Sequence, residues 1–211
     1  MTRLLGAIHE FDAPVVVLLA HPDDEALLCG GTIAALSDQG ADVRVVCFSD
    51  GAQGRDRTFH NVCGMLGAKG DLLDLPSSSI RLDERLVAIT DDLIRSLNPG
   101  CVITHTASGI QNQDHVALNA AVKLSIGRWP MPALALAVEP PISSGEFYPS
   151  VFVDITEHWN TKCEAVLAYR EVLDRDCMSD HYLKTRARWW GQVAGTSGRL
   201  VEAYEMLRWR A

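Results

Sequence analysis

The sequence predicts an α/β fold of the Rossmann type, with a mostly parallel sheet covered by helices on both faces, in a single domain over residues 1–211. Short apolar runs alternate with segments whose apolar residues recur at helical spacing, which is typical of β-α-β units. The first run, residues 15–20, is apolar without interruption, as expected of a parallel strand that is covered on both faces. The length also suits one hydrophobic core.

Each expected element has its own signal. Pro14 precedes the first apolar run, and Gly40 and Gly67 follow the first two helical patterns, where glycine commonly ends a helix. Asn98-Pro99-Gly100 ends an amphipathic helix before another buried strand. In chain order we expect strand 15–20, helix 24–39, strand 42–49, helix 57–66, strand 71–75, helix 82–97, strand 101–105, helix 114–126, strand 133–138, a rim loop at 139–150 and strand 151–155. Two or three helices are then expected to close the chain.

The composition argues for a globular protein and against two classes of partner. The chain has 27 acidic and 19 basic residues, a formal net charge of −8, whereas nucleic-acid binders normally carry a basic surface. No apolar run approaches the ~20 residues of a membrane span, and the N-terminus lacks the apolar core of a signal peptide. None of the six cysteines lies in a CxxC pair, which indicates buried free thiols in a reducing compartment. We expect a cytoplasmic protein without a nucleic-acid partner; the sequence shows no oligomeric interface and permits a homo-oligomer.

Polar residues follow three of the expected strands. In open parallel sheets, ligands bind beyond the carboxyl ends of the strands, where the strand order reverses. Residues 21–25 follow the first strand, Asp50 and Gly51 follow the second, and residues 105–115 include the end of the strand at 101–105 and the loop after it. We therefore expect these three segments on the same rim of the sheet.

The densest of these segments is His21-Pro22-Asp23-Asp24-Glu25. Helix capping explains one or two carboxylates in a first helical turn but gives no role to the histidine. An imidazole and a carboxylate three residues later suit Zn²⁺, and a catalytic zinc usually takes three protein ligands and a water. A neighbouring carboxylate that is not a ligand can serve as general base on that water. The spacing therefore favours a metal site.

The third ligand has to come from elsewhere on the rim. His105 and His115 flank the rim loop, whereas the other histidines lie before the first strand or within helical patterns. His115 follows Asp114 at the start of an expected helix and so repeats the arrangement of the first segment. The two motifs on one rim are a stronger signal than either motif alone.

Taken together, "AHPDDE", "SDG" after the second strand, and "TH" followed by "NQDH" resemble the LmbE-like (PIG-L) family of zinc-dependent N-deacetylases. The similarity continues in "EPPISSGEFYPSVFVDITEHWNTKCEAVLAY" and "WGQVAGTSGRLVEAYEMLR", so that it runs from about residue 14 to residue 208. The resemblance implies an LmbE-like fold and a small-molecule substrate that is an N-acetylated amino sugar or glycoconjugate.

The resemblance also implies roles for individual residues. His21, Asp24 and His115 match the zinc ligands of the family, and Asp23 matches its general base. A water activated by the metal would attack an acetamide carbonyl, and Asp23, once protonated, would pass the proton to the leaving amine. This hydrolysis needs no organic cofactor.

Two positions depart from the family pattern. Asn112 stands where many relatives have a histidine that is associated with stabilising the oxyanion or protonating the leaving group. An asparagine amide can donate a hydrogen bond to an oxyanion but cannot carry a proton, so we expect a catalytic role for Asn112, with acid catalysis falling more heavily on Asp23. The "NQDH" form resembles that of a subset of the family. Ala52 replaces an acidic residue that is frequent after the second strand, which places the family's usual substrate contacts there in question.

Other polar residues of the rim are candidates for contacts to the substrate or to a metal ligand. These are Asp50, Arg55, Arg57, His105, Asp114 and Glu139. For Asp50 and His105, a contact to a ligand and an ordinary role at a strand end both stay open. The two arginines could hold a sugar hydroxyl or a phosphate, or lie in solvent, and Glu139 could reach the rim or anchor a loop.

Two rival functions can be weighed on the same residues. A dinucleotide-dependent oxidoreductase would share the sheet pattern, but "HPDDEALLCGG" replaces G-x-G-x-x-G and its carboxylates would repel a pyrophosphate. A catalytically silent sugar- or metabolite-binding member of the same fold would need no base, so the intact Asp23 argues against it. The sequence favours a zinc-dependent N-deacetylase, with the silent binder as the alternative. Other divalent transition metals stay open as the ion in place of zinc.

Overall fold

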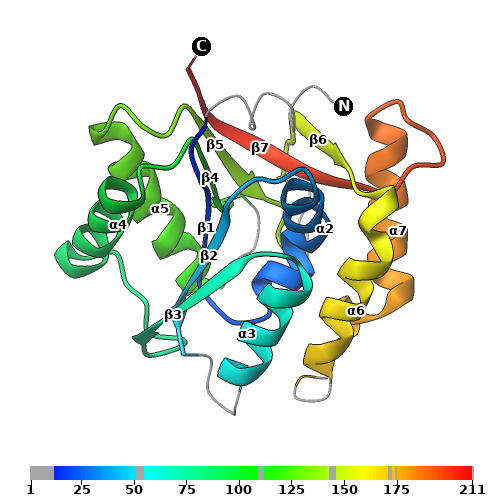
Figure 1. The fold of residues 1–211 in the computed structure, drawn as a ribbon, viewed down its shortest axis with the longest axis horizontal. Coiled ribbons are helices and arrows are strands. Elements are labelled where there is room, and N and C mark those ends of the chain that lie inside the picture. The colour runs from blue at the N-terminus through cyan, green and yellow to red at the C-terminus, as the bar shows by residue number, and fades with distance from the viewer. Residues whose placement is uncertain are drawn as a thin grey trace.

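The computed structural model describes residues 12–50, 55–108, 112–142, 146–170, 173 and 175–210. Within these residues, seven strands form one sheet in the order β3-β2-β1-β4-β5-β7-β6 (Figure 1). The first five strands pair in parallel, and β7 runs antiparallel between β5 and β6. The strands are β1 (Val15–Leu19), β2 (Val43–Ser49), β3 (Lys69–Leu75), β4 (Cys101–His105), β5 (Leu134–Val138), β6 (Val151–Asp154) and β7 (Val201–Trp209). The mostly parallel α/β fold that the sequence predicts is confirmed.

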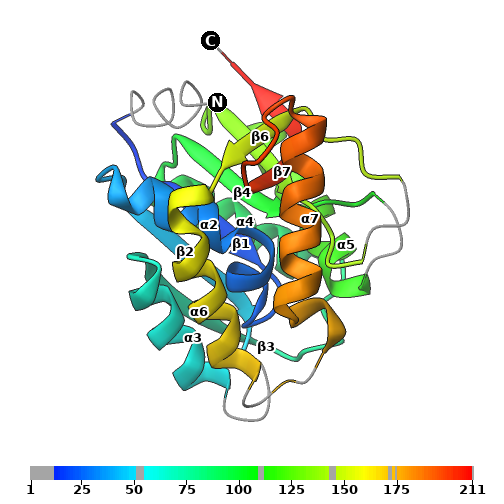
Figure 2. The ribbon, with the colours of Figure 1, turned by 90° about the vertical axis from the view of Figure 1, so that its right-hand side faces the viewer.

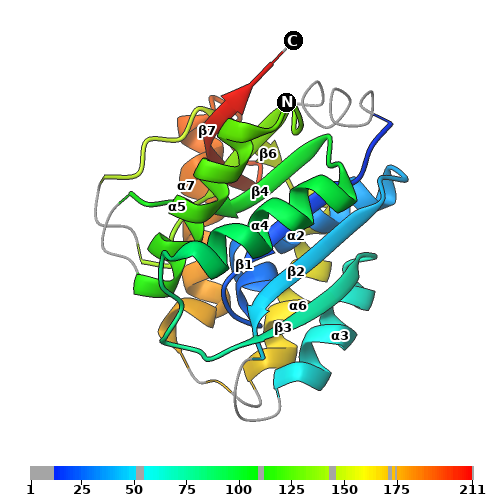
Figure 3. The same cartoon turned by 90° about the vertical axis from the view of Figure 1, so that its left-hand side faces the viewer.

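Helices cover both faces of this sheet. Figure 3 shows α4 and α5 on one face, and Figure 2 shows α2, α3, α6 and α7 on the other. Along β1, Val16 and Leu18 belong to the core under α4 and α5, whereas Val15, Val17 and Leu19 belong to the core on the opposite face. Both faces of β1 are therefore buried, which explains its uninterrupted apolar sequence. The helices are α2 (Asp24–Asp38), α3 (Arg55–Met65), α4 (Glu84–Leu97), α5 (Gln113–Arg128), α6 (Trp159–Arg170) and α7 (Asp180–Val193), with the short 3-10 turns η1 (Thr156–His158) and η2 (Asp176–Met178).

The end of the chain differs from the expectation. Two helices, α6 and α7, follow β6, but the chain closes with the strand β7, so the expectation that helices close it is wrong. The segment "VEAYEMLRW" is rich in residues that favour helices, such as Glu, Ala, Met and Leu. Its strand conformation comes from pairing with β5 and β6 on both sides, which outweighs the local preference.

The helix that follows β1 is broken in the middle. Cys29 has φ −142° and ψ 18°, which are not helical. Beyond the break, the N–H groups of Gly31 and Thr32 donate to the carboxylate of Glu202 on β7 at 3.0 and 2.8 Å. Before the break, Nζ of Lys162 on α6 donates to a backbone carbonyl at 2.9 Å and also to Glu202 at 2.5 Å. The buried ion pair thus caps both new helix ends and fixes the short segment that begins at residue 24.

Some expectations concern residues that the structure does not describe. Gly51 and Ala52 lie outside the described residues, as do residues 143–145 of the expected rim loop. The six cysteines are free, and four of them are buried, in agreement with the expectation. Among the described helices, none has the length and apolar character that crossing a membrane requires.

Candidate metal centre and active site

The candidate site lies where the order of the strands reverses. β1 is followed in the chain by its neighbour β2, whereas its other neighbour, β4, leads on to β5. His21 comes after β1, His105 ends β4, and His115 lies in the first turn of α5. One histidine from each of these segments reaches the crevice in which open α/β sheets bind ligands.

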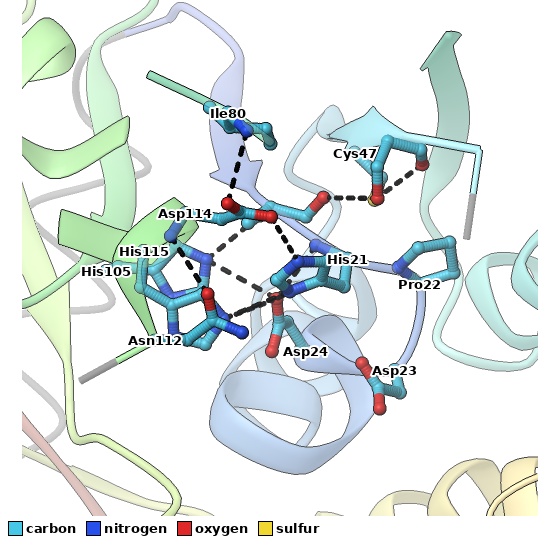
Figure 4. A network of polar contacts seen from close by, with 12 residues as sticks. His21, Pro22, Asp23, Asp24, Cys47, Ile80, His105, Asn112, Asp114 and His115 are labelled. Atoms are coloured by element: carbon cyan, nitrogen blue, oxygen red, sulfur yellow. Dashed lines mark hydrogen bonds and ion pairs between the residues drawn. The ribbon is translucent and has the colours of Figure 1, made fainter. Parts of the chain in front are cut away.

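His21, Asp24 and His115 converge on one point (Figure 4). Nδ1 of His21 lies 3.2 Å from Nε2 of His115 and 3.5 Å from Oδ2 of Asp24, and those two atoms are 3.3 Å apart. Ligand atoms of a tetrahedral zinc, bound at ~2.0–2.1 Å, are about 3.3 Å from one another. The three residues are buried, and their donor atoms fit a metal ion that two imidazoles and one carboxylate would hold.

A second carboxylate orients His21. Nε2 of His21 lies 2.9 Å from Oδ2 of Asp114, which also accepts the N–H groups of Ser78 and Ile80 at 2.6 and 3.2 Å through its two oxygens. In the neutral ring, a proton on Nε2 faces Asp114 and leaves the lone pair of Nδ1 for the convergence point. Burial lowers the pKa of His21, but Asp24 and Asp114 outweigh burial and raise it to about 9. The carboxylates therefore favour positive charge at this point.

Asp24 is the anionic member of the cluster. Burial alone would raise the pKa of Asp24, but the imidazoles of His115 and His105 hold it well below its usual range. Its Oδ2 also accepts the backbone N–H of His21 at 2.9 Å. A carboxylate has to be ionised to bind a metal, so this environment suits a ligand.

Asp23 points to another side of the motif and has a different environment (Figure 4). It is 1% exposed. Burial, helped by the charge of Asp24, raises the pKa of Asp23 to about 7, while Arg175 and Arg55 oppose this effect. Nη1 of Arg175 lies 3.3 Å from Oδ2 of Asp23, and Nη1 of Arg55 lies 4.0 Å from it. A carboxyl group that titrates near neutral pH can both accept and release a proton, as general acid–base catalysis requires.

Glu25 is fully buried beside Asp23. Its Oε2 accepts the backbone N–H of Asp23 at 3.1 Å, and its Oε1 accepts the hydroxyl of Tyr169 on α6 at 2.5 Å. Burial raises the pKa of Glu25 to about 8. Both carboxyl oxygens thus have a protein partner, one from the neighbouring residue and one from a distant helix.

His105 lies flat against His115, with ring centroids 3.7 Å apart and an angle of 9° between the planes. Its Nε2 accepts the backbone N–H of Ala20 at 2.9 Å. Burial lowers the pKa of His105 to about 4, so that the ring is neutral at neutral pH. Nε2 of His105 also lies 3.4 Å from Oδ2 of Asp24. His105 therefore bonds to backbone at the strand end and also contacts two of the candidate ligands, Asp24 and His115.

The other rim candidates lie at or near the starts of α5 and α3 and after the end of β2. Asn112 precedes α5 as its N-cap, and its side chain accepts the N–H of Asp114 at 2.9 Å. Arg55 is buried against the motif, whereas Arg57 is exposed on α3. Asp50 follows β2 and is exposed. The carboxylate that the structure places against His21 is that of Asp114.

Glu139 anchors α7 to the end of β5. Its carboxylate accepts Nε1–H of Trp190 at 2.7 Å and pairs with Arg186. One turn away, the hydroxyl of Tyr182 donates to the carbonyl of Pro141 at 2.5 Å. Of the two interpretations left open by the sequence, these contacts describe the anchoring of the loop.

Two residues beside Asp23 were not found from the sequence. Tyr169 is separated from Glu25 by 144 positions, and Arg175 is separated from Asp23 by 152. Neither follows a ligand spacing or a helix-capping pattern. Tyr169 does lie in the segment "EAVLAY", which resembles the family. That resemblance does not imply a role for Tyr169.

Comparison with known proteins yields matches in sequence. Residues 16–126 match the PIG-L family, described as GlcNAc-PI de-N-acetylase. The probable N-acetyl-alpha-D-glucosaminyl L-malate deacetylase 2 of Bacillus cereus is 30% identical over 183 residues, which cover 74% of this chain and 82% of that protein. The 4-oxalmesaconate hydratase of Pseudomonas putida is 25% identical over 182 residues, which cover 72% of this chain and 70% of that protein.

Solved structures share the fold. The 4-carboxy-2-hydroxymuconate hydratase of Pseudomonas putida superposes with a TM-score of 0.79 at 22% identity, over 94% of this chain and 98% of that chain. The N,N'-diacetylchitobiose deacetylase of Pyrococcus horikoshii also has a TM-score of 0.79, at 20% identity, over 93% of this chain and 84% of that chain. The same fold therefore occurs in deacetylases and in a hydratase.

Proposed function

The chain belongs to the PIG-L (GlcNAc-PI de-N-acetylase) family, and from this premise we propose that it is a zinc-dependent hydrolase that removes an N-acyl group, with N-acetyl as the first candidate, from an amino-sugar-containing small molecule or conjugate. Its relatives include deacetylases of amino-sugar conjugates. An enzymatic role is therefore favoured over the alternative of a silent sugar-binding protein.

One observation carries the proposal. Nδ1 of His21, Nε2 of His115 and Oδ2 of Asp24 lie 3.2 to 3.5 Å apart, and Asp23, the residue before Asp24, provides a separate buried carboxyl group. Two nitrogen ligands and one oxygen ligand are typical of catalytic zinc, which keeps a further position for water. A structural metal site would have no use for a base at this position.

In the proposed reaction, each of these residues has a task of its own. When bound by His21, Asp24 and His115, Zn²⁺ would lower the pKa of a water and polarise the acyl carbonyl. Asp23 takes the proton from the water as its oxygen attacks the carbonyl carbon, and Asp23 later returns that proton to the nitrogen as the C–N bond breaks. The amide of Asn112 donates to the oxygen on which negative charge develops. The products are a free amine and a carboxylate.

The names of two relatives support a proposal for the substrate class. The Bacillus cereus protein is named for a glucosaminyl malate, and a Corynebacterium diphtheriae relative is named for an acetamido-deoxy-glucopyranoside of myo-inositol. We infer that an N-acetylated amino sugar linked to a second group is the substrate of this chain. The cytoplasmic location stays a prediction from the sequence.

A screen for amine release tests the proposal. Purified protein is analysed for its metal content and then incubated with N-acetylglucosamine, its malate and myo-inositol conjugates, and N-acetylated chito-oligosaccharides. We expect a free amine from at least one of them, loss of the activity with a chelator, and recovery with Zn²⁺. Zinc-loaded protein that releases amine from none of them would contradict the proposal.

The hydratase relatives define a second arm of the same screen. A metal-activated water beside a base can also add to a carbon–carbon double bond, and hydratases share this fold. Unsaturated dicarboxylic acids are therefore offered to the protein, and the loss of their ultraviolet absorbance is followed. Hydration without amine release would assign the protein to the hydratases of the family.

A further inference from the structure

The backbone of Asp23 is strained. Its φ is 134° and its ψ is −27°, a conformation that residues with a Cβ rarely adopt. Such strain persists only where surrounding contacts hold it, and it concentrates at functional sites. Asp23 is also the residue whose carboxyl group we propose as the general base. The contacts that hold its backbone therefore determine where the proposed base points.

Glu25 and Tyr169 supply one such contact. The N–H of Asp23 donates to Oε2 of Glu25 at 3.1 Å, and the hydroxyl of Tyr169 donates to Oε1 of the same carboxyl group at 2.5 Å. Glu25 and Tyr169 are each 0% exposed. Because no solvent reaches Oε1, only a protein donor can satisfy it, and the rigid ring of Tyr169 fixes the plane of the carboxyl group.

We infer that Tyr169 and Glu25 are positioning residues, which hold the strained backbone of Asp23 and so keep its carboxyl group aligned for proton transfer. The inference rests on the proposed hydrolysis. Tyr169 lies on α6, which packs against α2, so that a helix far from the motif in sequence sets the geometry of the base. Proton transfer depends steeply on such alignment.

The chain offers a matched control for this inference. Tyr204 on β7 is also 0% exposed, and its hydroxyl donates to Oγ1 of Thr32 at 2.5 Å, within the network of Glu202 rather than at Asp23. Tyr169→Phe and Tyr204→Phe each remove one buried hydroxyl while keeping the ring. A fall in activity that came from lower stability alone would therefore appear in both variants.

The experiment compares the two variants in the zinc-loaded protein. For Tyr169→Phe we expect kcat to fall about 10- to 100-fold, with KM and zinc content within about twofold of the wild type. Tyr204→Phe leaves the bonds of Glu202 to Gly31, Thr32 and Lys162 in place and is therefore expected to keep kcat. A parallel measurement needs neither metal nor substrate: hydrogen exchange of the Asp23 amide is expected to be faster, by about tenfold, in Tyr169→Phe only.

The outcomes separate the two ideas. Equal kcat in Tyr169→Phe and Tyr204→Phe, in a wild type that does release amine, would overturn the positioning role and leave the proposed function intact. A wild type that releases no amine would contradict the proposed function, and the exchange of the Asp23 amide would still decide the inference. Unchanged exchange at Asp23 in Tyr169→Phe would overturn it.

Discussion

Asp23 and Asp24 are adjacent in the chain, yet they have opposite electrostatic environments. Against the effect of burial, the imidazoles of His115 and His105 hold the pKa of Asp24 well below its usual range. Burial raises the pKa of Asp23 to about 7. Carboxyl groups whose pKa values are pushed apart in this way suit different tasks. A permanent anion serves as a ligand, and a group that titrates near neutrality serves as a base.

Replacing the base alone should separate metal binding from turnover. In Asp23→Asn, we expect full zinc content and a fall in kcat of about 10²–10⁴-fold, the usual contribution of a general base. Elemental analysis and amine release measure the two quantities. The exposed Asp56 on α3 provides the control, since Asp56→Asn should change neither. Undiminished turnover of the Asp23 variant would contradict the proposed mechanism.

The carboxylate behind His21 can be tested in the same way. In Asp114→Asn, the amide oxygen can still accept a backbone N–H, but the charge 2.9 Å from Nε2 of His21 is lost. We expect the Kd for zinc to rise about 10- to 100-fold, as for other residues that orient a metal-bound histidine. Competition with a chelator measures the Kd. Asp83→Asn alters a carboxylate that caps α4 instead and should bind zinc as the wild type does.

The sequence predicts the local half of this site better than the distant half. His21 and Asp24 are found because their spacing places both at one strand end, and His115 because its surroundings repeat that pattern. Tyr169 and Arg175 contact the same motif from 144 and 152 positions away. Only the packing of α6 and the segment after it brings them there, so no local pattern in the sequence could mark them.

At the scale of elements, strands that are buried on both faces have a clear signal in the sequence. β1 and β4 are buried throughout; β1 is apolar without a break, and β4 begins with three apolar residues. In β7 the first four residues are buried, whereas the rest are intermediate or exposed and include charged side chains. The strand conformation of β7 depends on two partner strands that are distant in sequence, which explains why the sequence alone does not predict it.

The break in α2 also depends on residues that are distant in sequence, and it leads to a test of stability. Lys162 and Glu202 are 4% and 6% exposed, and together they satisfy the helix ends at the break. Lys162→Met leaves the charge of Glu202 buried without its cation. We expect the free energy of unfolding to fall by about 3–5 kcal/mol, as when one partner of a buried pair is removed.

Urea denaturation measures this change. Lys123→Met on α5 is the control, because Lys123 is exposed and a surface substitution of this kind changes stability by about 0.5 kcal/mol or less. Equal midpoints for the two variants would show that the buried pair does not hold the broken helix.

For the whole molecule, the cluster of His21, Asp24 and His115 joins parts that are far apart in the chain. His21 and His115 are 94 positions apart, and their nitrogens are separated by 3.2 Å. Asp24 begins α2, which covers one face of the sheet, and His115 belongs to α5, which covers the other, while His21 lies in the turn between β1 and α2 (Figure 1). A metal bound to all three would link both helical layers to the central strands.

Zinc should therefore stabilise the folded chain. At a free zinc concentration of 100 times the Kd, binding to the folded state alone contributes about 2.7 kcal/mol, which for a domain of this size corresponds to a rise in Tm of roughly 5–11 °C. Thermal melts with a chelator and with added zinc measure the rise. His115→Ala removes the ligand from α5 and should lose the rise, whereas His60→Ala, at an exposed position of α3, should keep it. An undiminished rise in His115→Ala would show that the metal binds elsewhere on the protein.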